Sequence, residues 1–498
     1  MFLNERSSFP PTQNTQFWDL KYREWASWYS GDPQLLLSFY TIVAAGTGTN
    51  EERFWARIEA EERAGIVHLP VAGDIAETSA NLLFSEQPKY KYNEEGKAGE
   101  RIKDFISENG FDNILLEGAE LAAALSGCII KLDMDKDLSK LPIVSVITPL
   151  QFYPTFRRGR LSEVLFFREV KANNAGMVWR LFENRRIENN SLLIEYQLHK
   201  GTCDKVGKIV PFDSIEETTN IDYSPVRYNT PILGCVYIPN KKPNKFEPGS
   251  SLGINDYSGC ITLMDSLDFT WTSLLRDIEL GMSQVFIDEE LLTRDKVTTS
   301  GETVYTNRFS KFAKSFIKLN LTSWKMGGES GTKPIDMCQF NIRVEEHLKA
   351  AKELFINIVS NSGYSPQTFG LGDFGSAESG TALRIRENKS QLTRNKKARY
   401  WQSAIESILF QMQLFDVATG LSSSYQPEKV NVEIEDSIIV DTKETSEILR
   451  NLKDAEAISN FTKIKMLHPE WDNEKIEEEV KRIVAEYGLT SNLFDNNV

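Results

Sequence analysis

The sequence SGTALRIRENKSQLTRNKKARYW, residues 379–401, leaves a glycine-rich segment and enters a stretch that is dense in positive charge. Between Arg384 and Arg399 it holds seven basic residues and one acid, Glu387, so its net charge is +6. The chain as a whole has a formal net charge of −14. Positive charge concentrated in one part of an acidic chain usually marks contact with an anion. A solvated helix face that is paired with acidic neighbours has the same pattern. Residues 379–401 alone leave both interpretations open.

The segments on either side of this boundary have contrasting structural preferences. Residues 363–380 contain Pro366 and five glycines, at positions 363, 370, 372, 375 and 380, which predicts a mobile loop. Residues Thr381–Thr419 are predicted as one helix, whose C-terminal half buries a stripe of Trp401, Ile405, Ile408, Leu409 and Met412. Ordinary globular helices run for about 10–14 residues. An isolated globular core is therefore a poor explanation for so long a helix.

Length and composition limit the class of protein. The chain has 498 residues, of which 41% are hydrophobic and 26% charged, as in soluble globular proteins of roughly two to four domains. Its longest apolar run, Leu121–Ile130, is far shorter than the roughly 20 residues that span a bilayer, so no membrane segment is expected. The first 16 residues lack an apolar core of the signal-peptide type, so secretion is not expected.

Residues that could carry catalysis or bind metal are scattered. The cysteines, at positions 128, 203, 235, 260 and 338, show no CxxC spacing and indicate buried thiols in a reducing cytoplasm. The histidines, at positions 68, 199, 347 and 468, are far apart. Residues 327–333 lack the Gly-Lys-Ser/Thr order of a phosphate loop, and Asp133, Asp135 and Asp137 are followed by Leu138 where a calcium loop needs glycine. We therefore expect no catalytic residues, no metal and no cofactor.

The first half of the chain has a mixed α/β pattern. Helices are predicted over Phe17–Ser30, where Gly31-Asp32-Pro33 is expected to end the helix, and over roughly 74–84 and 111–126. Alternating, β-rich segments follow at 128–133, 143–148, 161–170, 177–183, 192–199 and 226–237. Short connections between them favour antiparallel hairpins.

The second half is mainly helical, with a small β-containing insert. Apolar residues repeat at three or four positions from Asn255 to about Gln284 and again over about 343–360. Between these helices, 297–305 and 316–321 are predicted strands, so the pair forms a helical hairpin with a β tip. A strand at 429–436 and two or three amphipathic helices over 441–487 complete the predicted elements.

Several strings in this order resemble the portal proteins of tailed double-stranded DNA bacteriophages. They are LPVAGDIAETSANLLF at 69–84, PLQFYP at 149–154, the helix from Asp256 through Asp277-Ile278-Glu279, and SGTAL at 379–383 leading into the basic helix to Trp401. Each string alone is weakly specific. Their joint order over nearly the whole chain makes the resemblance specific.

The resemblance implies an α+β portal fold and assigns a part of it to each segment. Residues 1–254 would be a mixed α/β wing, and a helical-hairpin stem would consist of 255–284 and 343–362. A small β-containing clip would occupy 285–342, and 363–380 would be the tunnel loop. Residues 381–440 would hold a long kinked helix and a strand returning to the wing, and 441–498 a helical crown and tail.

The same resemblance implies function and partners. Such proteins form a homo-oligomeric ring, typically a dodecamer, at one capsid vertex, and double-stranded DNA is packaged and ejected through it. The clip would dock the terminase large subunit and later a head-completion or adaptor protein. Scaffolding and major capsid proteins are further expected partners. The expected location is the virion, with assembly in the host cytoplasm, and no membrane is involved.

Site residues follow from the needs of a conduit that admits a polyanion without holding it. A continuous basic wall would bind phosphates tightly, so an acidic lining with few basic bands favours sliding. The expected acidic residues of the stem are Asp265, Asp268, Asp277 and Glu279. The expected tunnel residues are Gly370, Gly372, Asp373, Phe374, Gly375, Ser376, Gly380, Arg384, Arg386 and Lys389. The remaining basic residues, which face either DNA or an adjacent subunit, are Arg394, Lys396, Lys397 and Arg399.

Two other classes of protein remain open from the sequence. One is a nucleic-acid-processing enzyme such as a nuclease, whose basic helix would bind substrate. It would need clustered carboxylates for two metal ions, and none stand out near the basic segment. The other is a helical scaffold or adaptor that binds protein partners without contacting DNA.

Overall fold

The computed structural model of the chain describes sixteen stretches of the sequence. They are residues 2–47, 53–58, 65–172, 176–219, 223–281, 284–288, 294–299, 302–307, 316–319, 335–338, 342–371, 380–422, 425–434, 442–455, 457–468 and 471–494. The chain divides into two compact units. The first comprises Met1–Leu371 and Lys389–Glu435, and the second comprises Gly372–Asn388 and Asp436–Val498.

The first unit begins with helices that pack on one another. They are α1 (Gln13–Tyr29), α2 (Pro33–Thr47), α3 (Val71–Phe84), α4 (Lys97–Glu108) and α5 (Phe111–Leu125). Thr12 caps α1 in a capping box with Thr15. The tryptophans of α1 at helical spacing, Trp18, Trp25 and Trp28, are buried together with residues of α2 and α3. The Trp stripe of α1 is therefore part of a hydrophobic core.

Two antiparallel sheets follow in this unit. A sheet of order β10-β2-β3 consists of Cys235–Pro239, Gly127–Asp133 and Ile143–Ile147. A larger sheet of order β4-β5-β6-β7-β8 consists of Phe152–Arg157, Arg160–Ala172, Met177–Glu188, Ser191–Thr202 and Lys205–Val210, and β9 (Val226–Tyr228) pairs with β7. The predicted antiparallel hairpins are confirmed.

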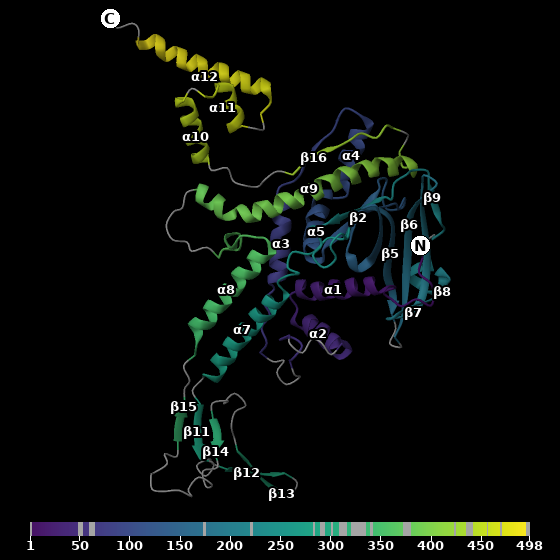
Figure 1. Cartoon of the computed structure of the whole chain (residues 1–498), viewed down its shortest axis with the longest axis vertical. Coiled ribbons are helices and arrows are strands. Elements are labelled where there is room, and N and C mark those ends of the chain that lie inside the picture. Colours follow the sequence, from purple (N-terminus) through teal and green to yellow (C-terminus); the bar gives the residue numbers. More distant parts are fainter. Residues whose placement is uncertain are drawn as a thin grey trace. The chain divides into compact units, whose positions relative to one another are not determined.

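A helical hairpin with β structure between its two helices follows in sequence. Helix α7 (Ile261–Leu280) and helix α8 (Val344–Ser362) run side by side (Figure 1). Between them in the chain, β11 (Gln284–Asp288) pairs with β14 (Phe316–Leu319) and β15 (Ile335–Cys338), and β12 (Arg294–Thr299) forms a hairpin with β13 (Glu302–Asn307). Helix α8 ends at Gly363, whose φ of +104° is the left-handed conformation that favours glycine.

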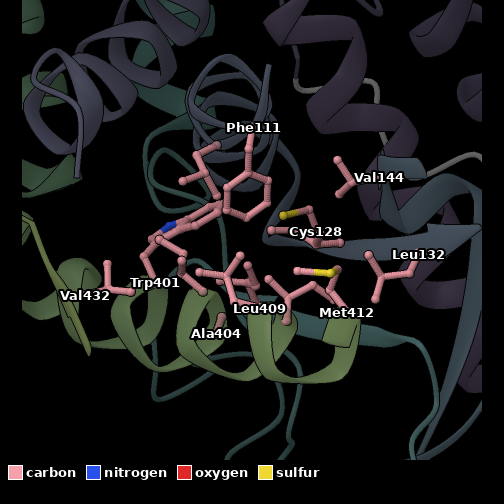
Figure 2. Close-up of a cluster of buried hydrophobic side chains, with 14 of the residues drawn as sticks. Phe111, Cys128, Leu132, Val144, Trp401, Ala404, Leu409, Met412 and Val432 are labelled. Atoms are coloured by element: carbon pink, nitrogen blue, oxygen red, sulfur yellow. The ribbon is translucent and has the colours of Figure 1, made fainter. Parts of the chain in front are cut away.

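Helix α9 (Gly380–Ala418) supplies one wall of a large core in the first unit. Figure 2 shows side chains of α9 pointing toward residues of α5, β2 and β3. The labelled residues of α9 are Trp401, Ala404, Leu409 and Met412; those of the other elements are Phe111, Cys128, Leu132 and Val144, and Val432 of the later strand is labelled as well. Trp401 is 1% exposed, and its ring meets Phe84 of α3 edge-on at 5.2 Å. Strand β16 (Asn431–Glu433) then pairs with β1 (Lys89–Lys91), which returns the chain to the N-terminal half.

The second unit contains helices α10 (Thr442–Asp454), α11 (Asn460–Leu467) and α12 (Asn473–Phe494). Ser459 caps α11 by accepting a hydrogen bond from the backbone N–H of Thr462. The amphipathic helices predicted over 441–487 are thus present.

The mixed α/β class is confirmed, but several predicted elements were wrong in detail. The helix predicted from Asn255 begins only at Ile261, and the single strand predicted over 297–305 is a hairpin that turns after Thr299. The single strand predicted over 226–237 is two strands, β9 and β10, which belong to different sheets. Elements that were not predicted include α2, α4, β1, β4, β8, β11 and β15. Helix α2 was missed because Asp32-Pro33 was interpreted only as the end of a helix, whereas Asp32 Oδ1 accepts from the N–H of Gln34 and Pro33 is the first helical residue.

Trp401→Ala is expected to lower the free energy of unfolding by about 3–5 kcal/mol, because it leaves a cavity where α9 meets α3 and α5. The exposed neighbour variant Gln402→Ala should change it by no more than about 0.5 kcal/mol. Urea unfolding followed by circular dichroism measures both. Equal midpoints for the two variants would contradict the assignment of α9 to this core.

Candidate nucleic-acid interface

The two basic residues nearest the glycine-rich segment, Arg384 and Arg386, belong to the first part of α9. Their backbone is helical, and their side chains lie outside the described residues. Gly380 is the first residue of α9, and Gly370 ends a short 3₁₀ turn (Pro366–Phe369) with a φ of +71°. Five further predicted tunnel residues, Gly372, Asp373, Phe374, Gly375 and Ser376, lie outside the described residues, whereas Lys389 is described.

Three of the predicted basic residues are exposed along α9. Lys389, Lys396 and Arg399 have exposed side chains, and Lys389 Nζ donates to the carbonyl oxygen of Ser360 at 2.6 Å. Exposed ammonium and guanidinium groups can be reached by an anion from the solvent. These three residues therefore form the accessible part of the basic stretch within the first unit.

Arg394 is buried, which corrects its prediction as a DNA-facing or inter-subunit residue. Its side chain is 5% exposed. The guanidinium donates to the carbonyl oxygen of Leu82 in α3 at 3.2 Å and to that of Ile434, just after β16, at 3.1 Å. Nη1 donates to Asn395 Oδ1 at 3.0 Å, so each guanidinium nitrogen has a partner within the chain, and Arg394 joins α9 to two other parts of that chain.

Lys397 is buried as well, and the prediction that it meets DNA or an adjacent subunit is wrong for the same reason. Its side chain is 2% exposed, and Nζ lies 2.5 Å from Oδ2 of Asp256. Nζ also donates to Ser79 Oγ at 2.6 Å and to Tyr364 Oη at 3.0 Å. All three donors of the ammonium are therefore used inside the chain.

The charges of this buried pair stabilise each other. Burial lowers the pKa of the Lys397 ammonium to about 8, while the Asp256 carboxylate opposes that shift. Burial by itself would raise the pKa of Asp256, but the positive charges of Lys397 and Lys241 and the hydrogen bonds from Lys397 and Asn240 hold it below the ordinary value. Asp256 also accepts from Tyr364 Oη at 2.8 Å. At neutral pH the two residues therefore form a charged, fully hydrogen-bonded pair.

The start of the glycine-rich segment is tied to α9, which corrects the prediction of a mobile loop from residue 363. Thr393 Oγ1 donates to the carbonyl oxygen of Gly363 at 2.6 Å, and the backbone N–H of Ser365 donates to Ser390 Oγ at 2.8 Å. Together with the Tyr364–Lys397 contact, these bonds fix residues 363–365 on α9. Short hydroxyl side chains on a helix face suit such contacts because they reach a neighbouring backbone at close range.

Two of the four predicted acidic residues of the stem are buried within the chain, so they do not form an exposed lining. Asp265 accepts from the backbone N–H of Phe54 at 2.8 Å, and burial raises its pKa. Asp268 is 1% exposed and accepts from Trp55 Nε1 at 3.0 Å and from the N–H of Leu69 at 3.0 Å. Their physical role is to fasten α7 to the N-terminal segment.

The other two acids lie near the C-terminal end of α7 and reach the surface. Asp277 Oδ2 lies 3.1 Å from His347 Nε2 and 3.0 Å from Arg343 Nη2. Hydrogen bonds from His347 and then Arg343 lower the pKa of Asp277. Glu279 is exposed. Only Asp277 and Glu279 of the predicted set can therefore contribute negative charge to a surface of α7.

Periodicity alone could have identified the buried basic residues. Positions 394, 397, 401, 405, 408 and 412 recur at three or four residues, so Arg394 and Lys397 continue the stripe that buries Trp401. The total charge of the stretch does not show this, because it does not distinguish one helix face from another. Asp256, Tyr364, Ser390 and Thr393 were missed as partners because they become neighbours only when distant segments pack.

Among the described residues, no three His, Cys, Asp or Glu side chains gather closely enough to hold a metal ion. In that part of the chain there is also no helix long and apolar enough to cross a membrane.

Lys397→Met should lower the free energy of unfolding by about 3–5 kcal/mol, because it leaves Asp256 charged and buried without its partner. Asp256→Asn should be comparably destabilising, and the double variant should lose less than the sum of the two single changes. The exposed neighbour variant Lys396→Met is the matched control. Urea unfolding measures all four proteins, and a Lys397→Met protein as stable as the control would contradict the pair's role.

Comparison with known proteins identifies the family. The family model described as "Phage portal protein, SPP1 Gp6-like" matches residues 20–488. The curated proteins contain no match to the chain. Solved structures that match include the virion of a native gene transfer agent particle, at 10% identity with 81% of this chain and 91% of that chain covered and a TM-score of 0.40. Another is the neck of an empty gene transfer agent particle computed with C6 symmetry, at 9% identity, 84% and 92% coverage and a TM-score of 0.35. Because the family match extends over nearly the whole sequence, the chain belongs to the family of SPP1 Gp6-like phage portal proteins.

Proposed function

We propose that this portal-family protein forms a ring at one capsid vertex and that double-stranded DNA enters and leaves the capsid through it. The observation that carries the proposal is the family match over residues 20–488, which includes α7, α8 and α9. The role is structural: the ring guides DNA that a separate motor moves.

The distribution of charge supports a conduit that does not retain its cargo. Each phosphate contact releases counterions, and several contacts together give tight, salt-dependent binding. Arg394 and Lys397 are buried and hydrogen-bonded inside the chain, which leaves Lys389, Lys396 and Arg399 exposed in the first unit. A short basic band in a chain of net charge −14 offers few phosphate sites per subunit, as weak, sliding contact requires.

We assign the DNA contact of each subunit to the tunnel segment and the beginning of α9. In this proposal residues 363–380 include the tunnel loop, and Arg384 and Arg386 face the bore or its entrance. The hydrogen bonds of Gly363 and Ser365 to α9 give the segment a fixed base. Asp277 and Glu279, the two non-buried acids of the predicted set, would repel the phosphates from the α7 surface.

The remaining parts of the chain take the roles implied by family membership. Residues 1–254 are proposed as the wing, 255–284 and 343–362 as the stem, 285–342 as the clip, 381–440 as the long helix with its returning strand, and 441–498 as the crown and tail. The clip would dock the terminase large subunit and later a head-completion or adaptor protein. Scaffolding and major capsid proteins would surround the ring during assembly in the host cytoplasm.

Native mass spectrometry of the purified chain tests the ring directly. We expect a closed assembly of about twelve subunits, the usual number for such rings. Only monomers or dimers, over a range of salt and protein concentrations, would favour an adaptor or an enzyme over a portal.

Reversing the charge of the two arginines nearest the loop should impair packaging. In Arg384→Glu/Arg386→Glu, the carboxylates would repel phosphates where the native guanidinium groups attract them, so DNA packaged per particle should fall by roughly tenfold or more. The control is Lys136→Glu/Lys140→Glu, which makes the same change of net charge at exposed residues outside α9. Intact rings that package normally with the double arginine variant would remove these arginines from the DNA path.

Removal of the β12–β13 hairpin should leave ring assembly intact and abolish docking of the packaging motor. Replacing Arg294–Asn307 with a short Gly-Ser linker deletes one two-stranded element and leaves the β14-β11-β15 sheet in place. Rings should still form, and binding of the terminase large subunit in a pull-down should be lost. A control with Gly-Ser substitutions in the exposed turn Asp135–Asp137 should retain binding. Terminase binding by the hairpin deletion would exclude this hairpin as the docking element.

A further inference from the structure

A small cavity opens between α1, β4 and the segment that follows β10. Its volume is about 200 Å³, below the roughly 300–1,000 Å³ of pockets that hold drug-sized ligands. Five aromatic residues line it, namely Trp18, Tyr22, Phe152, Tyr153 and Phe156. Two carboxylates, Asp19 and Glu247, also line it. Neither the wall nor the carboxylates take part in the DNA contact proposed above.

The aromatic walls are held in place by other rings. Trp18 stacks on Tyr22 with centroids 5.8 Å apart, and Tyr153 stacks on Phe167 at 4.7 Å. The ring of Phe156 meets Tyr237 edge-on at 5.5 Å. Because these neighbours fix the ring orientations, a ligand would enter a preformed cavity and little conformational entropy would be lost on binding.

The two carboxylates keep unused acceptor capacity. Glu247 Oε2 accepts from Trp18 Nε1 at 3.2 Å, and Asp19 Oδ2 accepts from Arg23 Nε at 2.7 Å. An ionised carboxylate has about four lone-pair sites, so one hydrogen bond leaves most of them available. The Arg23 side chain is 59% exposed whereas that of Asp19 is 16% exposed, so Arg23 is the more hydrated partner of the pair.

Negative charges of the lining act on its tyrosines, and two arginines partly offset them. Burial raises the pKa of Tyr22, and the charge of Glu247 adds to that shift. Burial and the charge of Asp19 raise the pKa of Tyr153, while the charges of Arg23 and Arg180 oppose that shift. The hydroxyl of Tyr153 is buried and has no hydrogen-bond partner among the described residues. An aromatic cavity with two carboxylates is unfavourable for anions and attracts a cation that can lie against the rings.

We propose that this cavity binds an organic cation, either a guanidinium or an alkylammonium group. Aromatic faces attract such cations, and the carboxylates supply charge-assisted hydrogen bonds at the same place. The group could arrive on a basic side chain of a protein partner or as a free polyamine, since both present the same chemistry. In either case the subunit gains a site for cations whose lining includes no residue of the basic helix.

Ligand-observed NMR titrations of the full-length protein test the site with three probes: L-arginine amide, L-citrulline amide and spermidine. Citrulline amide keeps the shape of the arginine side chain and lacks its charge. We expect saturable binding of at least one of the two cations and about tenfold weaker binding of citrulline amide. Preference for arginine amide would indicate a protein side chain, and preference for spermidine a free polyamine. No saturable binding of either cation, or equal binding of citrulline amide, would overturn the proposal.

Matched variants locate the binding. Glu247→Gln keeps an oxygen that can accept from Trp18, and Asp19→Asn keeps the side-chain shape, so both proteins should fold as the native chain does. Each variant should weaken cation binding about tenfold through loss of a charged acceptor. Glu86→Gln, at an exposed residue outside the cavity, controls for the change of net charge. Unchanged binding in both cavity variants, with circular dichroism spectra like that of the native protein, would refute this site.

Discussion

The buried ion pair between Lys397 and Asp256 is the contact on which the arrangement around α9 depends. It connects the middle of α9 to the segment before α7, while Ser79 and Tyr364 bring α3 and the end of α8 to the same ammonium. A charged pair of this kind is costly to bury and tolerates the loss of either partner poorly. Through its partners the pair links four chain segments, so removing either charge would weaken the contacts among all four.

This anchoring divides the basic stretch into two groups with different physical roles. Arg394 and Lys397 follow the buried stripe of α9 and bind groups of their own chain, whereas Lys389, Lys396 and Arg399 lie on the exposed faces. The same division separates the acids of α7, since Asp265 and Asp268 fasten the helix and only Asp277 and Glu279 reach the surface. For a proposed DNA conduit the division matters, because only exposed charge sets the strength of phosphate contact.

Much of the fold could be predicted from local patterns. The antiparallel strands, the α7–α8 hairpin, the long α9 and the C-terminal helices all carry strong periodicity, and the structure contains them. Short or weakly patterned elements such as β8 and α2 were missed, the latter because Asp32-Pro33 both ends one helix and begins the next. The strand predicted over 297–305 turns after Thr299, a change of direction that alternation alone does not encode.

By itself the sequence determined the family, the order of the elements and the concentration of charge, because these are carried by strings, periodicities and counts along the chain. Only the tertiary structure decided which charged side chains are buried and which are exposed to solvent. Lys397 and Asp256 are 141 residues apart, and Arg394 meets Leu82 across 312 residues, so no local window contains both partners. Whether a charged side chain serves as an anchor or as an exposed contact depends on burial, and burial is a property of packed segments rather than of any one segment.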